Sequence, residues 1–212
     1  MEEGIKIYSR ADNLVSMRIY SGHFATPHSH INYFIDMTNL KARQNEAEAA
    51  ARVLAARYSA STVVDTIICM DGCEIIGAYL AQDLSQVGTL SMNMHKTIYI
   101  AAPEAAPGGQ LIFRENMQHM IRDKNVVLLF ASATTGETIK SSLECVLYYG
   151  GRISGIASIF SAITKIGGLE VNSIFTEKDI PDYKTYPAAS CPMCREGRKL
   201  DAMVNNYGYS KL

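Results

Sequence analysis

The sequence lacks the long apolar stretch that a membrane-spanning helix requires. Its longest charge-free, apolar-leaning run in the C-terminal half is 153–164, which is well short of the ~20 residues that cross a bilayer. Residues 1–6 (MEEGIK) are acidic and have no apolar core, which is not the pattern of a secretory signal. Both absences lead us to expect a cytoplasmic protein without membrane contacts.

The sequence also lacks an excess of charge of either sign. It has 20 basic and 21 acidic residues among 212, so the formal net charge is −1. Proteins that bind nucleic acid through bulk electrostatics have a marked basic excess, and we therefore expect no nucleic-acid partner. Apolar residues make up 48% and charged residues 19%, a composition typical of globular rather than disordered chains.

Cysteine is scarce and odd in number, with five residues in the chain. Without a secretory signal, free thiols are the expected state. Cys191 and Cys194 have the Cys-x-x-Cys spacing that supplies half of a zinc site. The sequence shows no second such pair nearby, so we interpret these cysteines as packing residues of the tail and predict no metal ligands.

Three histidines, His23, His28 and His30, lie within eight residues of one another. If this stretch is extended, His28 and His30 share one face. The cluster is compatible with a metal or anion site, and equally with a polar surface loop, which is the interpretation favoured here.

Strand and helix patterns alternate along the chain. Continuous β-branched, apolar runs at 62–70 and 126–130 predict strands that are buried on both faces, as in a parallel sheet. The predicted strands are 16–20, 33–35, 62–70, 97–100, 126–130, 153–160 and 171–175; the predicted helices are 40–58, 74–81, 111–121 and 137–149; loops are expected at 21–30 and 101–110, and an irregular tail from 183. This order predicts an α/β fold with a mostly parallel central sheet and flanking helices.

The strongest candidate binding site is the turn that follows the strand at 126–130. Small and hydroxyl-bearing residues surround a glycine at the start of the next predicted helix, namely Thr134, Thr135, Gly136, Glu137 and Thr138. The backbone N–H groups of such a turn and the positive end of the helix can bind an anion, although an ordinary N-capping turn has a similar composition. Ligands of parallel sheets bind at the carboxyl ends of the strands. The turn formed by Asp71, Gly72 and Cys73 would therefore be a second rim of the same cleft.

Together these segments resemble the type I phosphoribosyltransferases, with orotate phosphoribosyltransferase as the nearest match. The Thr-Thr-Gly-x-Thr turn at 134–138 is similar to the phosphoribosyl-pyrophosphate motif of that family. Ser21-Gly22-His23 and residues 32–36 (NYFID) resemble its N-terminal hood, and residues 191–197 (CPMCREG) resemble the ending of many bacterial and archaeal members. The resemblance implies a hood at 1–40, an α/β core at 41–180 and a tail at 181–212 that packs on the hood, all within one domain.

The resemblance also implies an activity and site residues. The reaction would transfer a phosphoribosyl group from phosphoribosyl pyrophosphate to a pyrimidine base, in nucleotide biosynthesis or salvage, with Mg²⁺ as cofactor and the protein as a homodimer. The turn at 134–138 would bind the 5-phosphate. Asp71, Gly72 and Cys73 would form the pyrophosphate loop, and the residues near the base would be Tyr33, Phe34 and His23.

The sequence departs from the family pattern in three places, one of which is the hood lysine, where this chain has His23. The family has adjacent acidic residues where this chain has Phe130 and Ala131, and a phenyl ring or a methyl group cannot accept hydrogen bonds from ribose. It also has basic residues where 101–105 (AAPEA) has none; candidates to replace them are His95, Lys96 and Arg114. These departures leave open an alternative function, a catalytically impaired relative that binds a nucleotide or phosphorylated ligand through the retained turn.

Overall fold

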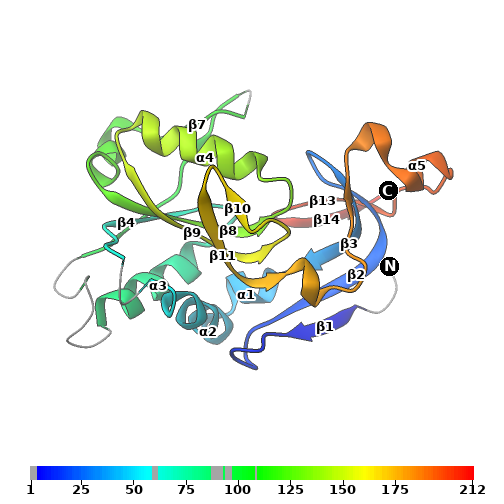
Figure 1. Ribbon diagram of the computed structural model, residues 1–212, viewed down its shortest axis with the longest axis horizontal. Helices are drawn as coiled ribbons and strands as arrows, with labels where there is room; N and C mark the ends of the chain where they lie inside the picture. Colours follow the sequence, from blue (N-terminus) through cyan, green and yellow to red (C-terminus); the bar gives the residue numbers. More distant parts are fainter. Residues whose placement is uncertain (1–3, 59–61, 87–92, 94–96, 108) are drawn as a thin grey trace.

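The computed structural model describes residues 4–58, 62–86, 93, 97–107 and 109–212. Figure 1 shows two sheets side by side, a core sheet flanked by helices and a second sheet that holds both ends of the chain. We call this second sheet and the segments packed on it the hood. In the part of the chain that is described, no helix is long and apolar enough to cross a membrane.

The core sheet has the strand order β10-β11-β9-β8-β4-β5. All neighbours in it are parallel except β10, which pairs antiparallel with β11 at one edge. Its strands are β4 (Thr66–Cys69), β5 (Tyr99–Ala101), β8 (Asn125–Ala133), β9 (Arg152–Ser161), β10 (Lys165–Ile166) and β11 (Leu169–Thr176). The predicted α/β fold with a mostly parallel sheet is confirmed.

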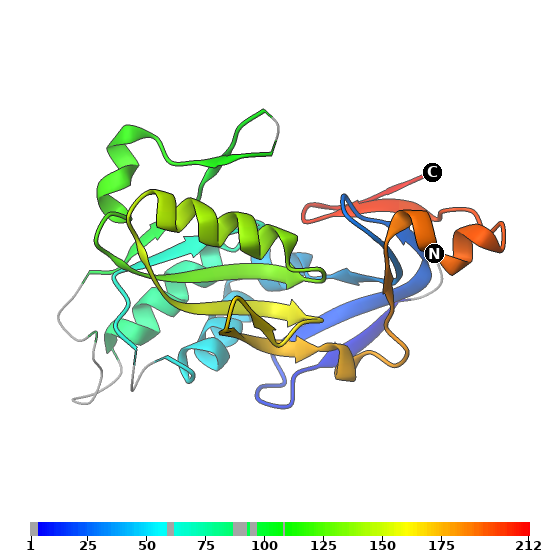
Figure 2. The same cartoon turned by 45° about the horizontal axis from the view of Figure 1, so that its top comes forward.

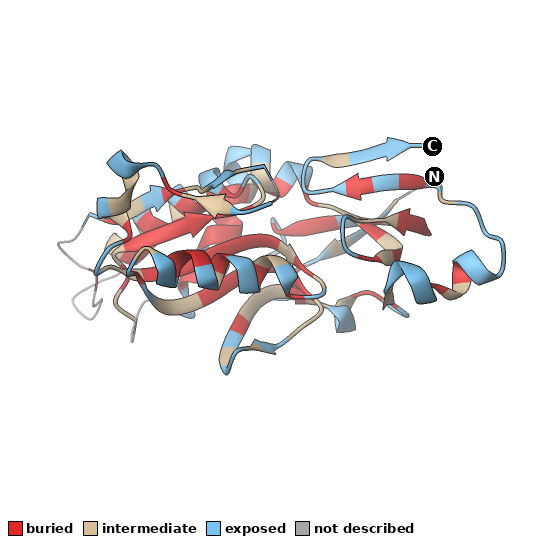
Figure 3. Ribbon diagram, turned by 90° about the horizontal axis from the view of Figure 1, so that it is seen from above, coloured by how far each residue is buried: buried red, intermediate tan, exposed pale blue. Residues whose placement is uncertain are grey.

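Helices cover both faces of the core sheet. Helices α2 and α3 lie on one face and α4 on the other (Figures 1 and 2). The helices are α1 (Thr38–Ala42), α2 (Gln44–Ala55), α3 (Glu74–Gln86), α4 (Glu137–Tyr148) and, in the hood, α5 (Pro192–Arg195). Because both faces are covered, the middle strands are mostly apolar, and Figure 3 shows them buried along most of their length.

Strand β8 shows how alternation divides the core. Val127, Leu129 and Ala131 belong to the cluster under α2 and α3, which also contains hood residues. Leu128 and Phe130 belong to the cluster under α4. Successive strand residues point to opposite faces, so the two residues at the acidic positions of the family pattern have different surroundings.

The hood sheet has the order β12-β3-β2-β13-β14, and β1 pairs with β2 off this path. Its strands are β1 (Ile5–Tyr8), β2 (Ser16–Ala25), β3 (His30–Asp36), β12 (Thr185–Tyr186), β13 (Ala202–Asn205) and β14 (Gly208–Lys211). The predicted loop at 21–30 is therefore wrong over half its length, because β2 continues to Ala25 through a register shift between Ser21 and Phe24. The predicted irregular tail is also wrong, because β12, β13 and β14 add to the hood sheet.

Two predicted helices differ from the structure. The helix at 40–58 is broken at Arg43, whose extended backbone (φ −94°, ψ 125°) ends α1 and precedes α2. The helix at 111–121 is absent: Leu111–Ile112 forms β7, paired with β6 (Glu104–Ala105), and a 3₁₀ helix follows at Glu115–Met120. Tertiary contacts override local propensity there, since Phe113 is buried and its N–H donates to the Tyr149 hydroxyl at 3.2 Å. Two further 3₁₀ turns are Glu177–Asp179 and Ala188–Ser190.

Candidate functional site

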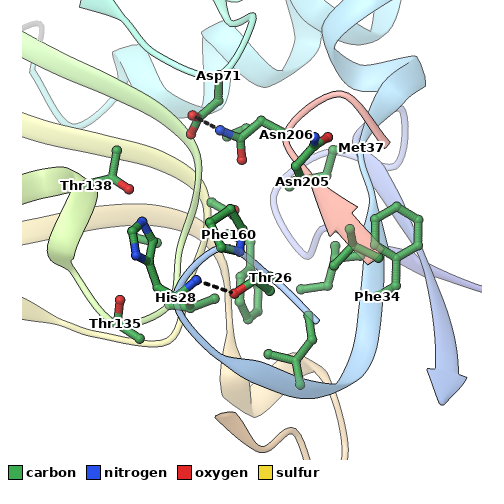
Figure 4. Close-up of a pocket in the computed structure, with 18 of the residues that line it drawn as sticks. Thr26, His28, Phe34, Met37, Asp71, Thr135, Thr138, Phe160, Asn205 and Asn206 are labelled. Carbon is green, nitrogen blue, oxygen red and sulfur yellow. Dashed lines mark hydrogen bonds between the residues drawn. The ribbon is translucent and has the colours of Figure 1, made fainter. Parts of the chain in front are cut away.

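A cavity of about 200 Å³ lies between the core and the hood. One wall is formed by the last residues of β8 and the turn after it, from Ala131 to Gly136, and by the first turn of α4. The opposite wall comes from the hood, through the 26–28 loop, β3 and the β13–β14 turn (Figure 4). The cavity thus opens at the carboxyl end of a central parallel strand, where ligands of such sheets bind.

The turn at the start of α4 presents hydrogen-bond donors to this cavity. Thr134, Thr135, Gly136 and Thr138 all line it. Among the described residues, none accepts a hydrogen bond from the backbone N–H groups of 134–138, as expected before and within the first turn of a helix. These N–H groups, the threonine hydroxyls and the positive end of a 12-residue helix together make a site suited to an anion.

Glycine is required at the centre of this turn. Gly136 has φ +82°, the left-handed region that side chains disfavour. A Cβ at this position would lie 2.9 Å from Ile166 Cδ1 and 3.0 Å from Ile163 Cδ1. A side chain at this position would be strained by the backbone conformation and would displace one of these isoleucines.

Glu137 is the one member of the predicted phosphate turn that does not line the cavity. Its carboxylate accepts a hydrogen bond from Lys140 Nζ at 2.7 Å, and both side chains are exposed. This contact holds the pKa of Glu137 below its ordinary value. The negative charge therefore lies outside the cavity, and only the backbone of Glu137 is available to an anion.

Of the three residues predicted as a pyrophosphate loop, Asp71 lines the cavity. Its carboxylate accepts a hydrogen bond from Asn206 Nδ2. Burial is the main influence on this carboxyl group and raises its pKa to about 6. Gly72 and Cys73 do not line the cavity. Cys73 is fully buried, and burial raises the pKa of its thiol well above the ordinary value, so it is not available as a nucleophile.

Lys41 brings a positive charge to the same side of the cavity. Its ammonium donates to the backbone oxygen of Asp71 at 2.8 Å and to that of Asn206 at 2.5 Å. It therefore ties the loop after β4 to the turn between β13 and β14. Among the described residues that line the cavity, Lys41 is the only lysine or arginine.

The hood contributes the apolar part of the cavity. Phe34, one of the predicted base-binding residues, lines it with Ile31, Met37 and Val204, and Phe160 adds a ring from β9. The Phe34 ring is held by Tyr20 at 6.1 Å and Tyr209 at 5.5 Å between ring centroids. One end of the cavity thus offers polar donors and the other an apolar, aromatic wall.

The two other predicted base-binding residues do not line the cavity. Tyr33 packs against the hydrophobic core from a half-buried position. His23 is completely buried, and its ring contacts His30, Cys191 and Cys194.

The residues suggested as replacements for the missing basic loop are not brought to the cavity by any described contact. Arg114 forms an ion pair with Glu104 at 2.6 Å, and both side chains are exposed. His95 and Lys96 lie outside the described residues.

The cavity residues do not by themselves form a Mg²⁺ site. Two carboxylates line it, Asp36 and Asp71. Asp36 accepts the Thr38 N–H at 2.9 Å, and Asp71 accepts the hydrogen bond from Asn206 Nδ2. No set of three metal-binding side chains occurs at the cavity among the described residues, whereas a protein site for Mg²⁺ uses carboxylate oxygens that remain free to coordinate.

Several lining residues are not found by sequence reasoning. In the sequence, Lys41 has the pattern of an ordinary helix residue, and Asn205-Asn206 has that of an ordinary turn. All three line the cavity. Thr26 and His28 lie in a loop that is distinguished in the sequence only by its polar composition. In the core sheet, a turn at the end of a strand indicates a binding site. No comparable sequence pattern predicts which residues of the hood line the cavity.

Comparison with known proteins supports the fold alone. No protein-family model matches the sequence, and no curated protein matches it. Among solved structures, UMP synthase of Leishmania donovani aligns with a TM-score of 0.55 at 14% identity, over 77% of this chain and 34% of that one. The chain therefore spans about a third of that enzyme's length.

Two further structures align over most of both chains. Adenine phosphoribosyltransferase of Trypanosoma brucei, in complex with AMP, pyrophosphate and ribose 5-phosphate, has a TM-score of 0.54 at 14% identity, covering 78% of each chain. Orotate phosphoribosyltransferase of Mycobacterium tuberculosis H37Rv, in complex with Fe(III) dicitrate, has a TM-score of 0.52 at 13% identity, covering 78% of this chain and 93% of that one. The chain has the fold of the type I phosphoribosyltransferases. Within this phosphoribosyltransferase fold, the cavity is bounded by both the core and the hood.

Proposed function

We propose that the cavity binds a ligand that carries a ribose 5-phosphate group and that the protein transfers this group to a pyrimidine base, as orotate phosphoribosyltransferase does. The single observation that carries the proposal is the turn at the N-terminus of α4, where Thr134, Thr135, Gly136 and Thr138 line the cavity and the N–H groups of 134–138 have no acceptor among the described residues. The 5-phosphate is assigned to this turn.

The apolar wall supports a planar base at the other end of the same ligand. Phe34 and Phe160 line the cavity there, and contacts between aromatic rings and a heteroaromatic ring are favourable. In the reaction, the bond from ribose C1 to pyrophosphate breaks, a bond from C1 to a ring nitrogen forms, and the proton of that nitrogen passes to solvent. Pyrophosphate leaves with the bonding electron pair. The residues of this chain bind and orient the two reactants.

A second function, binding without transfer, is favoured by one feature of β8. Phe130 is fully buried in the cluster under α4, and Ala131 faces the cavity with a methyl group. Neither side chain accepts a hydrogen bond from ribose. Single groups that stabilise developing charge are worth about 3–4 kcal/mol each in a transition state. The missing acids and basic residues would therefore lower the rate by several orders of magnitude.

Calorimetric titration of the purified protein separates these functions. Phosphoribosyl pyrophosphate with and without Mg²⁺, ribose 5-phosphate and nucleoside monophosphates are titrated in turn, and pyrophosphate release is then measured with orotate. Binding of phosphoribosyl pyrophosphate with release of pyrophosphate supports the transferase. Binding of monophosphates without turnover supports the second function. No binding of any of these ligands would contradict the site assignment itself.

We further propose that the protein is a homodimer, as the resemblance implies. Sedimentation equilibrium of the protein, with and without ribose 5-phosphate, tests this proposal. A monomer over the micromolar range would contradict it.

A further inference from the structure

Four side chains that are candidates for metal binding converge within the hood. His23 comes from β2, His30 from the start of β3, and Cys191 and Cys194 from the segment that forms α5, more than 160 residues later. Their ligand atoms, one from each residue, all lie within 4.8 Å of one another. This group, which we call the His/Cys cluster, does not line the cavity.

The spacing of the ligand atoms is that of a tetrahedral zinc site. His23 Nε2 lies 3.1 Å from His30 Nδ1 and 3.6 Å from both sulfur atoms, and Cys194 Sγ lies 3.3 Å from His30 Nδ1. Zn–N bonds of about 2.05 Å and Zn–S bonds of about 2.3 Å in a tetrahedron place ligand atoms about 3.4 Å (N to N) and about 3.6 Å (N to S) apart. The observed distances agree with these values to within about 0.3 Å.

The buried histidine is oriented as a ligand would need to be. His23 Nδ1 lies 2.9 Å from the backbone oxygen of Arg198. A carbonyl oxygen only accepts hydrogen bonds, so Nδ1 carries the proton and Nε2 presents its lone pair to the two sulfur atoms. A backbone carbonyl that fixes the tautomer in this way is the usual outer partner of a metal-bound histidine.

A β-bulge places His23 at this position. The register between β2 and β3 shifts between Ser21 and Phe24, and such a bulge re-aims the side chains of its strand. The bulge is held by the C-terminal segment, because the His23 N–H donates to Asp201 Oδ2 at 2.7 Å and the Asp201 N–H donates to the His23 oxygen at 2.8 Å. Gly22 leaves room for this contact, since a Cβ there would lie 2.8 Å from Asp201 Oδ2.

The segment that carries the two cysteines has almost no hydrophobic core of its own. Between residues 187 and 200, only Cys191 and Met193 are buried. Fixing each backbone residue costs about 1–2 kcal/mol of conformational entropy, and two side chains do not offset this for fourteen residues. A bound metal commonly supplies the missing free energy in such small, loop-rich units.

We propose that His23, His30, Cys191 and Cys194 bind one zinc ion that fastens the C-terminal segment to strands β2 and β3. Two thiolates and two neutral imidazoles balance the charge of Zn²⁺, so the partly buried site is neutral. All four positions are protein side chains, which is the composition of a structural rather than a catalytic zinc site.

The zinc site also fixes one wall of the cavity. His23 and His30 flank residues 24–29, and Thr26 and His28 in that loop line the cavity (Figure 4). The metal would therefore hold both ends of the loop while its middle faces the ligand. Zinc binding does not depend on the proposed transferase activity, and it can be measured without a substrate.

The test is the metal content of the full-length, untagged protein purified without chelator, measured by mass spectrometry of the elements. We expect about one zinc per chain. After stripping with a chelator under reducing conditions, Co²⁺ should restore the visible absorption of tetrahedral, thiolate-bound cobalt. The variants Cys194→Ser and His30→Asn should lose zinc, because even the loss of an outer partner weakens metal affinity about 10- to 100-fold.

Matched controls are Cys145→Ser and His119→Asn, which change a cysteine and a histidine outside the cluster. Cys145 Sγ donates to the Leu111 oxygen, a bond that serine can replace, and His119 is exposed. Both controls should keep about one zinc per chain.

Three results would overturn the proposal. They are the absence of both zinc and a cobalt spectrum in the reduced wild-type protein, full zinc content in both ligand variants, and a Cys191–Cys194 disulfide in protein purified without oxygen. If the ligand variants fail to fold, the cobalt spectrum of the wild-type protein still decides.

Discussion

Asp71 provides a direct test of the electrostatics at the cavity. Burial raises the pKa of its carboxyl group from 3.8 to about 6, so the folded protein binds this proton more tightly than the unfolded chain does. The stability that protonation of Asp71 contributes is therefore complete below pH 3.8 and is lost as the pH rises through about 6. Replacing Asp71 with asparagine removes this dependence.

The expected change in the free energy of unfolding follows from the shift in the pKa of Asp71. Moving the pKa from 3.8 to about 6 corresponds to a loss of about 3 kcal/mol between the acidic and the neutral extremes. Between about pH 5 and about pH 7 the linkage relation gives a loss of about 1 kcal/mol. The free energy of unfolding of Asp71→Asn, minus that of the wild-type protein, should rise by this amount over the same interval.

The assay is urea denaturation of both proteins at several pH values, because the difference between them cancels every other titrating group. Glu74→Gln is a second variant for which the direction of the change in the pH dependence of stability can be predicted. Glu74 is exposed and its charge raises the pKa of Asp71, so the variant should lose stability at a lower pH than the wild-type protein. A difference between Asp71→Asn and the wild-type protein that is flat with pH, or that falls as the pH rises, would refute the reasoning.

Three further sets of substitutions or treatments test the remaining features. Gly136→Ala should lower stability by about 1–2 kcal/mol and weaken ribose 5-phosphate binding, as measured by melting and calorimetry. Gly167→Ala is its control, since φ is also positive there but nothing lies within 4 Å of the added Cβ. Ala131→Asp should raise affinity for phosphoribosyl pyrophosphate, because Ala131 lines the cavity. Phe130→Glu should destabilise the fold by about 3 kcal/mol or more, because its charge would be buried. Metal removal should lower the melting temperature and speed tryptic cleavage within 195–199, and Cys194→Ser should show neither response to a chelator.

Each of these expectations has a contradicting result. Equal losses of binding in Gly136→Ala and Gly167→Ala would mean that the turn at 134–138 does not contact the ligand. Unchanged affinity in a folded Ala131→Asp variant would mean that ribose does not lie beside β8. A melting temperature that does not respond to a chelator would argue against a stabilising metal.

Local patterns were sufficient for the parallel strands of the core sheet. The apolar, β-branched run before Thr134 predicts β8 because a strand buried on both faces can hold few polar side chains. The helix after Gly136 is predicted because small and hydroxyl residues precede an amphipathic segment. The cavity wall formed by the turn between them could therefore be found from the sequence, since a strand end and a helix start are defined by neighbouring residues.

The hood could not be predicted in the same detail. Its sheet pairs β2 and β3 with β12 and β13, which are more than 150 residues away, and short strands of this kind acquire their register only from their partners. The helix predicted at 111–121 was wrong for a related reason. The conformation of this segment depends on the burial of Phe113 and on the hydrogen bond from the Phe113 N–H to the Tyr149 hydroxyl.

The α/β core, the position of the turn at 134–138 and the absence of acids at Phe130 and Ala131 all follow from local sequence patterns. That these two residues face opposite sides of β8, and that Lys41 and Asn206 contact Asp71, follows from the packing of distant segments. The same packing places His23 outside the cavity, beside His30 and two distant cysteines. The physical reason is that periodicity and turn chemistry act between neighbours along the chain, whereas a ligand set or a cavity wall is made by residues whose proximity exists only after folding.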